Sequence, residues 1–385
     1  MDRRSLLKGA VALSLLSVPG AAWAQGTVKI GVILPYSGQF ADLTTQLDNG
    51  INLYAKQNGD TVAGKKIEII RKDSGGVAPD VATRLAQELI TRDNVDILAG
   101  LLLSPNAIAV SKVSAEAKKF TVIMNAATTS IINVSPYSVR SSITFLAIGS
   151  SAAAWAYKSG VRKAYTMVSD YAPGKDIEAV FHETFKKAGG EIVGSVHMPV
   201  ANPDFSAFVQ RAKDINPESI FIFVPGGAQP AALGKAFAER GVDAKKITII
   251  GTGEVVDESS LKNMGDAALG IISVWHYDYN DDSKVNKEFV AAYNAEYKRN
   301  PDFGSVGGYD GMRVIYQALK NTGGRSDGDS LIAAAKGLTF ESPRGPFQIS
   351  PETRDIVETV YVRQVRKVGD ALRNVVIDKV EPGGK

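Results

Sequence analysis

The chain has 385 residues, enough for two domains, and its 44 basic and 41 acidic residues leave a formal net charge of +3. This near-neutral balance argues against a protein that binds nucleic acid or an anionic membrane surface. The absence of cysteine excludes disulfides, thiolate metal sites and the lipid-bearing cysteine of a lipoprotein.

Residues 1–24 have the layout of a cleavable secretory signal. Arg3, Arg4 and Lys8 make a basic start, residues 9–18 are apolar but too few to span a bilayer, and residues 22–24 form a small-x-small cleavage pattern. The mature chain is expected to begin after residue 24, following export by either the Sec or the twin-arginine route. Because no later apolar run is long enough to cross a membrane, we expect a soluble periplasmic protein without direct membrane insertion.

Apolar strands alternate with amphipathic helices through the first part of the mature chain. Strands are predicted over 28–34, 66–71, 95–102 and 121–124, and helices over 43–58, 79–92 and 105–118. Strands of continuous apolar residues between helices predict a parallel sheet that is covered on both faces.

The same alternation restarts at residue 163. Strands are predicted over 163–169, 191–198, 219–224, 246–250 and 357–365, with helices over 173–187, 205–212, 230–239, 289–297, 306–319 and 330–336. The predicted fold is therefore α/β with two doubly wound units, roughly 27–144 and 147–274. No long linker separates them, so several short crossings are expected to form a hinge.

Two strand ends of the first unit carry groups suited to an anion. Ser104 and Pro105 follow a buried strand, where Ser104 can cap the next helix and the amides of its first turn favour a carboxylate. Residues 125–130 follow the neighbouring strand and add small residues and hydroxyls. Ligands of open α/β sheets bind at such strand ends, so a binding site is favoured over two unrelated helix caps.

Motifs for other chemistry are absent from the sequence. His182, His197 and His276 lack metal-ligand spacing and are interpreted as structural. The chain has no nucleophile elbow and no phosphate-binding loop signature, and Gly226-Gly227 reads as a plain strand-to-helix turn rather than a phosphate cradle. We predict no catalytic residue, no metal and no cofactor; an exported α/β enzyme is the less favoured alternative.

The order and spacing of several segments over residues 27–370 resemble a known family. These segments are 30–38, 73–74, 100–104, 125–128, 169–176, 204–206 and 226–230. The chain resembles periplasmic solute-binding proteins of ABC importers, of the branched-chain amino acid (Leu/Ile/Val-binding) type. The resemblance implies a type I periplasmic binding protein fold with a three-crossing hinge. Lobe 1 would comprise 27–145 and 278–352, and lobe 2 would comprise 146–277 and 353–385.

The resemblance also implies a ligand site, residue by residue. Ser104 matches the serine that holds the ligand carboxylate, and Thr128 matches the threonine hydroxyl beside it. The positions implied for backbone contact and for the apolar pocket wall are Ala126, Ala127, Leu102 and Leu103. A ligand that bears a carboxylate is therefore expected.

The second lobe departs from the amino-acid pattern of the family. Ala228 replaces a tyrosine, and Glu254 matches the acidic residue that holds the ligand ammonium only with an offset of about one position. A buried ammonium without its acceptors is penalised, so we favour a flat aromatic acid, such as a benzoate or hydroxycinnamate. The aromatic-acid binders belong to the same family. A branched-chain or other aliphatic amino acid is the alternative ligand.

Four further residues were considered for this site. Tyr171, Trp275 and Phe303 are candidates to wall an aromatic ring, with core packing as the alternative. Arg140 either pairs with a carboxylate or forms a structural ion pair at the hinge. Closure of the lobes would present the loaded, monomeric protein to an inner-membrane permease. Alternatively, the protein would serve as the ligand-sensing subunit of a periplasmic receptor.

Overall fold

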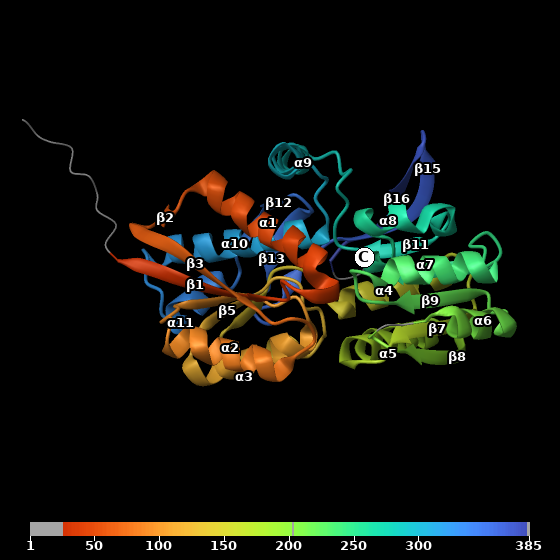
Figure 1. Ribbon diagram of the computed structural model, residues 1–385, viewed down its shortest axis with the longest axis horizontal. Coiled ribbons are helices and arrows are strands. Elements are labelled where there is room, and N and C mark those ends of the chain that lie inside the picture. The colour runs from red at the N-terminus through yellow and green to blue at the C-terminus, as the bar shows by residue number, and fades with distance from the viewer. Residues whose placement is uncertain (1–25, 202–203, 383–385) are drawn as a thin grey trace, which may run out of the picture.

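The structure, a computed structural model, describes residues 26–201 and 204–382. The expected signal over residues 1–24 lies outside the described residues. Two lobes lie side by side along the long axis of the molecule, each built on a mainly parallel sheet with helices packed on it (Figure 1). The predicted two-lobe α/β fold is therefore confirmed. Within the described ranges, no helix combines the length and apolarity needed to cross a membrane.

Lobe 1 is built on a six-stranded sheet with the order β2-β3-β1-β4-β5-β6, in which only β2 runs antiparallel to its neighbour. Its strands are β1 (Thr27–Leu34), β2 (Thr61–Val62), β3 (Lys65–Asp73), β4 (Ile97–Gly100), β5 (Phe120–Ile123) and β6 (Ser138–Arg140). Its helices are η1 (Gly38–Phe40), α1 (Ala41–Asn58), α2 (Pro79–Thr91), α3 (Ser104–Ala117), η2 (Ile131–Asn133), α9 (Lys284–Tyr297), α10 (Phe303–Asn321) and α11 (Gly328–Ala335). A small sheet of β12 (Thr339–Ser342), β13 (Gly345–Ile349) and β14 (Ile356–Val357) completes it.

Lobe 2 is built on a seven-stranded sheet with the order β16-β15-β11-β10-β9-β7-β8, antiparallel at β11-β15-β16 and parallel elsewhere. Its strands are β7 (Lys163–Ser169), β8 (Glu191–Met198), β9 (Ser219–Phe223), β10 (Thr248–Thr252), β11 (Ile272–Trp275), β15 (Val360–Val368) and β16 (Ala371–Val380). Its helices are α4 (Phe145–Lys158), α5 (Ala172–Lys187), α6 (Ser206–Ile215), α7 (Gln229–Arg240), η3 (Gly253–Val256), α8 (Glu258–Met264) and η4 (Gly265–Ala268).

The elements follow from the apolar spacing of the sequence. All four residues of β4 are buried, as expected for a central parallel strand covered on both faces. Helix α2 begins with Pro79 at its first turn and buries Leu85 and Leu89, which are four residues apart. Gly31 of β1 lets this helix approach, because a Cβ there would lie 2.8 Å from Leu89 Cδ1. Close packing of helices on the strands leaves the strand ends free to form a site.

The chain passes between the lobes three times. The crossings are residues 141–144, between β6 and α4; residues 276–283, between β11 and α9; and residues 358–359, between β14 and β15. Three short connections hold the lobes at one edge and permit a hinge motion rather than free tumbling.

Arg344, in the turn between β12 and β13, touches all three crossings. Its guanidinium donates to the carbonyl of Ser142 in the first and lies 2.8 Å from His276 Nδ1 in the second. It also lies 3.5 Å from the carboxylate of Glu358 in the third, and its Nε donates to Asp310 at 3.0 Å. These side chains are buried. We call this set of residues the hinge cluster.

Candidate functional site

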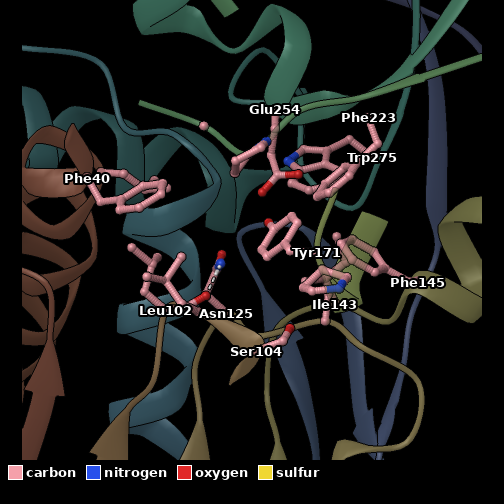
Figure 2. Close-up of a pocket in the computed structure, with 16 residues that line it drawn as sticks. Phe40, Leu102, Ser104, Asn125, Ile143, Phe145, Tyr171, Phe223, Glu254 and Trp275 are labelled. Carbon is pink, nitrogen blue, oxygen red and sulfur yellow. Dashed lines mark hydrogen bonds between the residues drawn. The ribbon is translucent and has the colours of Figure 1, made fainter. Parts of the chain in front are cut away.

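A pocket lies between the lobes at the carboxyl ends of parallel strands from both sheets (Figure 2). Its empty space is about 410 Å³, counting space open to solvent, and small-molecule sites enclose roughly 300–1,000 Å³. The lining residues are Phe40, Leu43, Leu102, Leu103, Ser104, Asn125 and Ala127 from lobe 1, Ile143, Phe145 and Trp275 at the hinge, and Tyr171, Pro173, Phe223, Pro225, Gly226 and Glu254 from lobe 2.

Ser104 lies at the lobe 1 end of the pocket (Figure 2). The structure corrects one expectation: Leu103 occupies the N-cap of α3, Ser104 is the first helical residue, and no side-chain cap bond forms. The Ser104 Oγ instead accepts a hydrogen bond from the amide of Thr128 at 3.3 Å. Acting there as an acceptor, the hydroxyl keeps its own proton for another partner. Together with the first-turn amides of α3, it suits an anion such as a carboxylate.

The apolar wall of lobe 1 is formed where β4 ends. Leu101 adopts the left-handed conformation with φ +64°, which is uncommon for a residue other than glycine and turns the chain out of the strand. Leu102 and Leu103 then line the pocket. The Asn125 side chain donates to the Leu102 carbonyl at 3.0 Å and so ties the loops after β4 and β5 together (Figure 2).

The predicted residues after β5 divide between the pocket and its surroundings. Ala127 lines the pocket, but Ala126 does not. The amide of Ala126 donates to Leu101 O at 3.0 Å and its carbonyl accepts from Arg140 at 3.3 Å, so this backbone is already engaged. Thr128 lies behind Ser104 rather than on the pocket surface, with its Oγ1 buried and without a partner among the described residues.

Arg140 forms the structural ion pair that was one of its two expected roles. Its guanidinium donates to both carboxylate oxygens of Asp355 at 2.7 and 2.6 Å, and to the Thr128 carbonyl at 2.9 Å. Its side chain is fully buried and is absent from the pocket lining. Arg140 therefore supports the loop that carries Thr128 instead of facing the ligand.

Glu254 lies at the opposite end of the pocket from Ser104 (Figure 2). Burial and the nearby Asp257 raise the pKa of its carboxyl group to about 8. Among the described residues, the Glu254 carboxyl group accepts one long hydrogen bond, from Thr252 Oγ1 at 3.4 Å. The group is therefore mostly protonated at neutral pH.

Aromatic side chains form the remaining wall, and two of the three predicted rings are among them. Tyr171 and Trp275 line the pocket. The Tyr171 ring stacks on Phe223, with centroids 6.1 Å apart and an interplanar angle of 11°, and Phe145 meets Phe223 edge-on at 5.1 Å. Phe303 does not line this pocket; it packs edge-on behind Trp275 at 5.1 Å and borders an adjoining cavity.

Ala228 also lies outside the inner pocket, at the wider opening between the lobes beside Gln39 and Asp42. The preceding turn is where lobe 2 meets lobe 1. Gly226 lines the pocket, and a Cβ on Gly227 would lie only 2.4 Å from the Gln39 carbonyl oxygen. These glycines therefore permit close approach of the lobes.

Several lining residues were not predicted from the sequence. They are Phe40, Leu43, Ile143, Phe145, Pro173, Phe223, Pro225 and Gly226, whereas Asn125 belongs to the segment 125–130 that was expected at the site. Pro225 directly follows the strand predicted over 219–224, and that position is the signal that could have identified it and the neighbouring Gly226. The apolar residues have the pattern of ordinary core positions.

No group of three or more histidine, cysteine, aspartate or glutamate residues in the described chain is arranged to hold a metal ion. His197 and His182 hydrogen-bond within a cluster around Glu178 and Thr166, away from the pocket lining. His276 belongs to the hinge cluster, and burial and Arg344 keep its pKa well below the usual value.

Comparison with known proteins assigns the family. A family model described as periplasmic binding protein matches residues 27–370. A Leu/Ile/Val-binding protein homolog 6 of Brucella melitensis is 38% identical over 362 residues, covering 93% of each chain. A solute-binding protein of an ABC transporter from Rhodopseudomonas palustris BisB5, solved with 3,4-dihydroxybenzoic acid, is 49% identical with a TM-score of 0.89, over 92% of this chain and 98% of that one.

A second such structure, from R. palustris HaA2 with p-hydroxybenzoic acid, is 40% identical with a TM-score of 0.89, over 92% of this chain and 97% of that one. At this likeness the fold is the type I fold of these proteins. The chain belongs to the periplasmic binding protein family and is a solute-binding protein of the ABC-transporter type, not an enzyme.

Proposed function

We propose that this protein captures a small aromatic carboxylate between its lobes and delivers it, by lobe closure, to the permease of an ABC importer. One observation carries the proposal: a single pocket joins an anion-binding end at Ser104 to a wall of stacked and edge-on aromatic rings. The aromatic acids bound by the two Rhodopseudomonas relatives support the same ligand class.

The ligand carboxylate would sit at the lobe 1 end. The Ser104 hydroxyl has a proton to donate, the amides at the start of α3 provide further donors, and the positive end of the helix dipole favours the charge. The Thr128 Oγ1 is buried directly behind Ser104 without a partner among the described residues, so a second hydroxyl lies next to this end of the pocket.

The aromatic ring would fill the middle of the pocket. Leu102 and Leu103 bound it from lobe 1, and Tyr171, Phe145 and Trp275 bound it from the hinge and lobe 2. Because contacts come from both lobes, a bound ring favours the closed arrangement, and only such differential contact shifts a conformational equilibrium.

A branched-chain amino acid is the second candidate, favoured by the naming of the Brucella relative and by an acidic residue, Glu254, in the pocket. An ammonium at this end would require Glu254 to ionise beside Asp257, against the raised pKa. A sensing role for the loaded protein would use the same pocket with a different partner.

A calorimetric screen tests the proposal. The mature protein is titrated with 4-hydroxybenzoate, benzoate, leucine, isoleucine and valine, and melted with each at 100 times its dissociation constant, where binding adds about 2.7 kcal/mol to the stability. We expect the aromatic acids to bind and the amino acids not to. Tight binding of leucine that is abolished in Glu254→Gln would overturn the proposal.

We also propose that residues 1–24 are removed on export and that the mature protein is a monomer whose lobes divide at the crossings 141–144, 276–283 and 358–359, so that residues 353–357 belong to lobe 1 rather than to lobe 2 as the resemblance implied. The mass of the protein recovered from the periplasm tests the cleavage. Light scattering during gel filtration tests the monomer, and a dimer at micromolar concentration would contradict it.

A further inference from the structure

We infer that Trp275 and Glu254 form a subsite that recognises a hydroxyl group on the ligand ring, at the end opposite the carboxylate. This inference rests on the proposed function and narrows it from aromatic acids in general to ring-hydroxylated benzoates. The two residues line the same pocket as Ser104 and come from different segments, β11 and η3.

The first observation is an unsatisfied donor. The Trp275 side chain is 2% exposed, yet its indole Nε1 has no hydrogen-bond partner among the described residues. Buried indole N–H groups normally find an acceptor, since leaving one unpaired is costly. Figure 2 shows the indole nitrogen on the pocket side of the ring, toward Glu254. An oxygen atom of a ligand in the pocket would satisfy this donor.

The second observation is the neighbouring acceptor. The Glu254 carboxyl group is 7% exposed, lines the pocket and holds one long hydrogen bond, from Thr252. A phenolic hydroxyl has one proton to donate and lone pairs to accept. It can therefore donate to an oxygen of Glu254 and accept from the Trp275 N–H at once, so that both buried groups gain a partner.

The charges around Glu254 suit a neutral hydroxyl. Asp257, after η3, and burial raise the pKa of Glu254, while Tyr171 at the start of α5 and Thr252 of β10 face it as neutral hydroxyls. Asp257 in turn lies near the buried Asp302. Among the described residues that shift the pKa of Glu254 there is no cation, so its carboxyl group is kept neutral and can pair with an uncharged hydroxyl.

A ligand that lacks the hydroxyl would leave both groups unpaired in a dry pocket. Sites that are built to hydrogen-bond a substrate hydroxyl discriminate strongly against the analogue without it. We expect 4-hydroxybenzoate to bind at least about tenfold more tightly than benzoate. 4-Methoxybenzoate can accept from Trp275 but cannot donate to Glu254, so it should bind more weakly than 4-hydroxybenzoate.

Isothermal titration calorimetry of the mature protein with these three acids makes the first test and needs no variant. The second test uses Trp275→Phe and Glu254→Met, which remove the donor and the acceptor while keeping apolar bulk. Each should lower the affinity for 4-hydroxybenzoate about tenfold more than the affinity for benzoate, since both residues also border the ring. Trp155→Phe is the matched control, because Trp155 packs on the core of lobe 2 away from the pocket.

Equal affinity of the unaltered protein for benzoate and 4-hydroxybenzoate would overturn the inference while leaving the proposed function intact. An equal loss of affinity for both ligands in Trp275→Phe and Glu254→Met would also overturn the inference and leave the proposed function intact. Binding of neither acid, with tight binding of leucine, would overturn the proposed function itself and this inference with it.

Discussion

Thr129, in the loop after β5 of lobe 1, donates both its amide and its hydroxyl to one carboxylate oxygen of Asp176 in α5 of lobe 2, at 2.8 and 3.0 Å. This contact spans the cleft and exists only while the lobes are together. It shares its loop with Thr128, whose amide bonds Ser104. One loop therefore carries both the interlobe contact and part of the carboxylate end of the pocket.

Removal of this interlobe contact should weaken ligand binding without changing the pocket. Hydrogen bonds to a charged group contribute about 1.5–3 kcal/mol, so Asp176→Ala should reduce affinity for 4-hydroxybenzoate by about tenfold or more. Calorimetry measures the affinity, and small-angle X-ray scattering should report a more open ligand-free protein. Asp214→Ala, at an exposed carboxylate on α6, is the control. Unchanged affinity in Asp176→Ala would show that the contact does not stabilise closure.

Gly227 offers a steric test of the same closure. A methyl group there would lie 2.4 Å from the Gln39 carbonyl oxygen of lobe 1, and the residue has φ +88°. Gly227→Ala should therefore hold the lobes apart and weaken binding at least about tenfold, beyond a backbone strain of roughly 1 kcal/mol. Gly241→Ala is the matched control, since Gly241 also has a positive φ, +62°, but lies away from the cleft. Equal effects of the two substitutions on affinity would contradict the steric argument.

Ser104 and Thr128 test the carboxylate end. Ser104→Ala removes the donor that faces the pocket, and Thr128→Val removes the buried hydroxyl while keeping its shape. Each should weaken benzoate binding about tenfold, equivalent to about 1.4 kcal/mol. Ser111→Ala is the control, because Ser111 is a buried serine on the same helix outside the pocket. Full affinity in both variants would place the carboxylate elsewhere.

Much of the fold was predictable because it depends on local apolar patterns. The predicted strand over 163–169 coincides with β7, and the helix expected over 173–187 is α5 with one more residue at its start. Helix α4 was not predicted: it is buried on several sides where it packs near the hinge, so its sequence lacks a clear polar face. Strand β16 was missed because the apolar residues of this mostly half-buried edge strand fall in short runs and do not alternate with polar ones.

The residues of the candidate site likewise divide into those that the sequence indicates and those that it does not. Ser104 could be placed at the site because a strand end followed by a helix start is visible in sequence, whereas Leu102 and Leu103 were implied by the resemblance to the binding-protein family. The pairing of Arg140 with Asp355 joins residues more than two hundred positions apart, and no local pattern indicates it. The apolar lining residue Phe223 resembles any core residue until the lobes are assembled.

The hinge cluster should stabilise the folded protein as well as hold the three crossings together. Arg344→Met removes the cation that pairs with Asp310 and Glu358 in buried surroundings, which should cost about 3–5 kcal/mol of unfolding free energy. Urea denaturation followed by circular dichroism measures the change. Arg325→Met, at an exposed arginine, is the control and should change stability by less than about 0.5 kcal/mol. If Arg344→Met changed the stability as little as Arg325→Met, the crossings would be held in place by their backbone alone.

The buried carboxyl groups predict how stability depends on pH. Burial raises the pKa of Glu254 to about 8, that of Glu358 to about 8 and that of Asp302 to about 7, whereas such groups titrate near pH 4 in an unfolded chain. Between these values the folded state holds more protons than the unfolded state, so the free energy of unfolding falls as pH rises. The buried His276 has a lowered pKa, so it makes the free energy of unfolding rise with pH. It does so only below about pH 6.5, where the unfolded chain would protonate it.

The window from about pH 7 to 8.5 therefore isolates the carboxyl groups. The free energy of unfolding, measured by urea denaturation, should decrease across it, by up to about 1.4 kcal/mol per pH unit for each carboxyl group that still holds its proton in the folded protein. Glu254→Gln should flatten the slope, because an amide does not lose a proton, whereas Glu352→Gln at an exposed position should leave it unchanged. A slope that Glu254→Gln leaves unchanged would mean that Glu254 is already ionised in the folded protein. An ionised Glu254 would favour an ammonium ligand over a phenol.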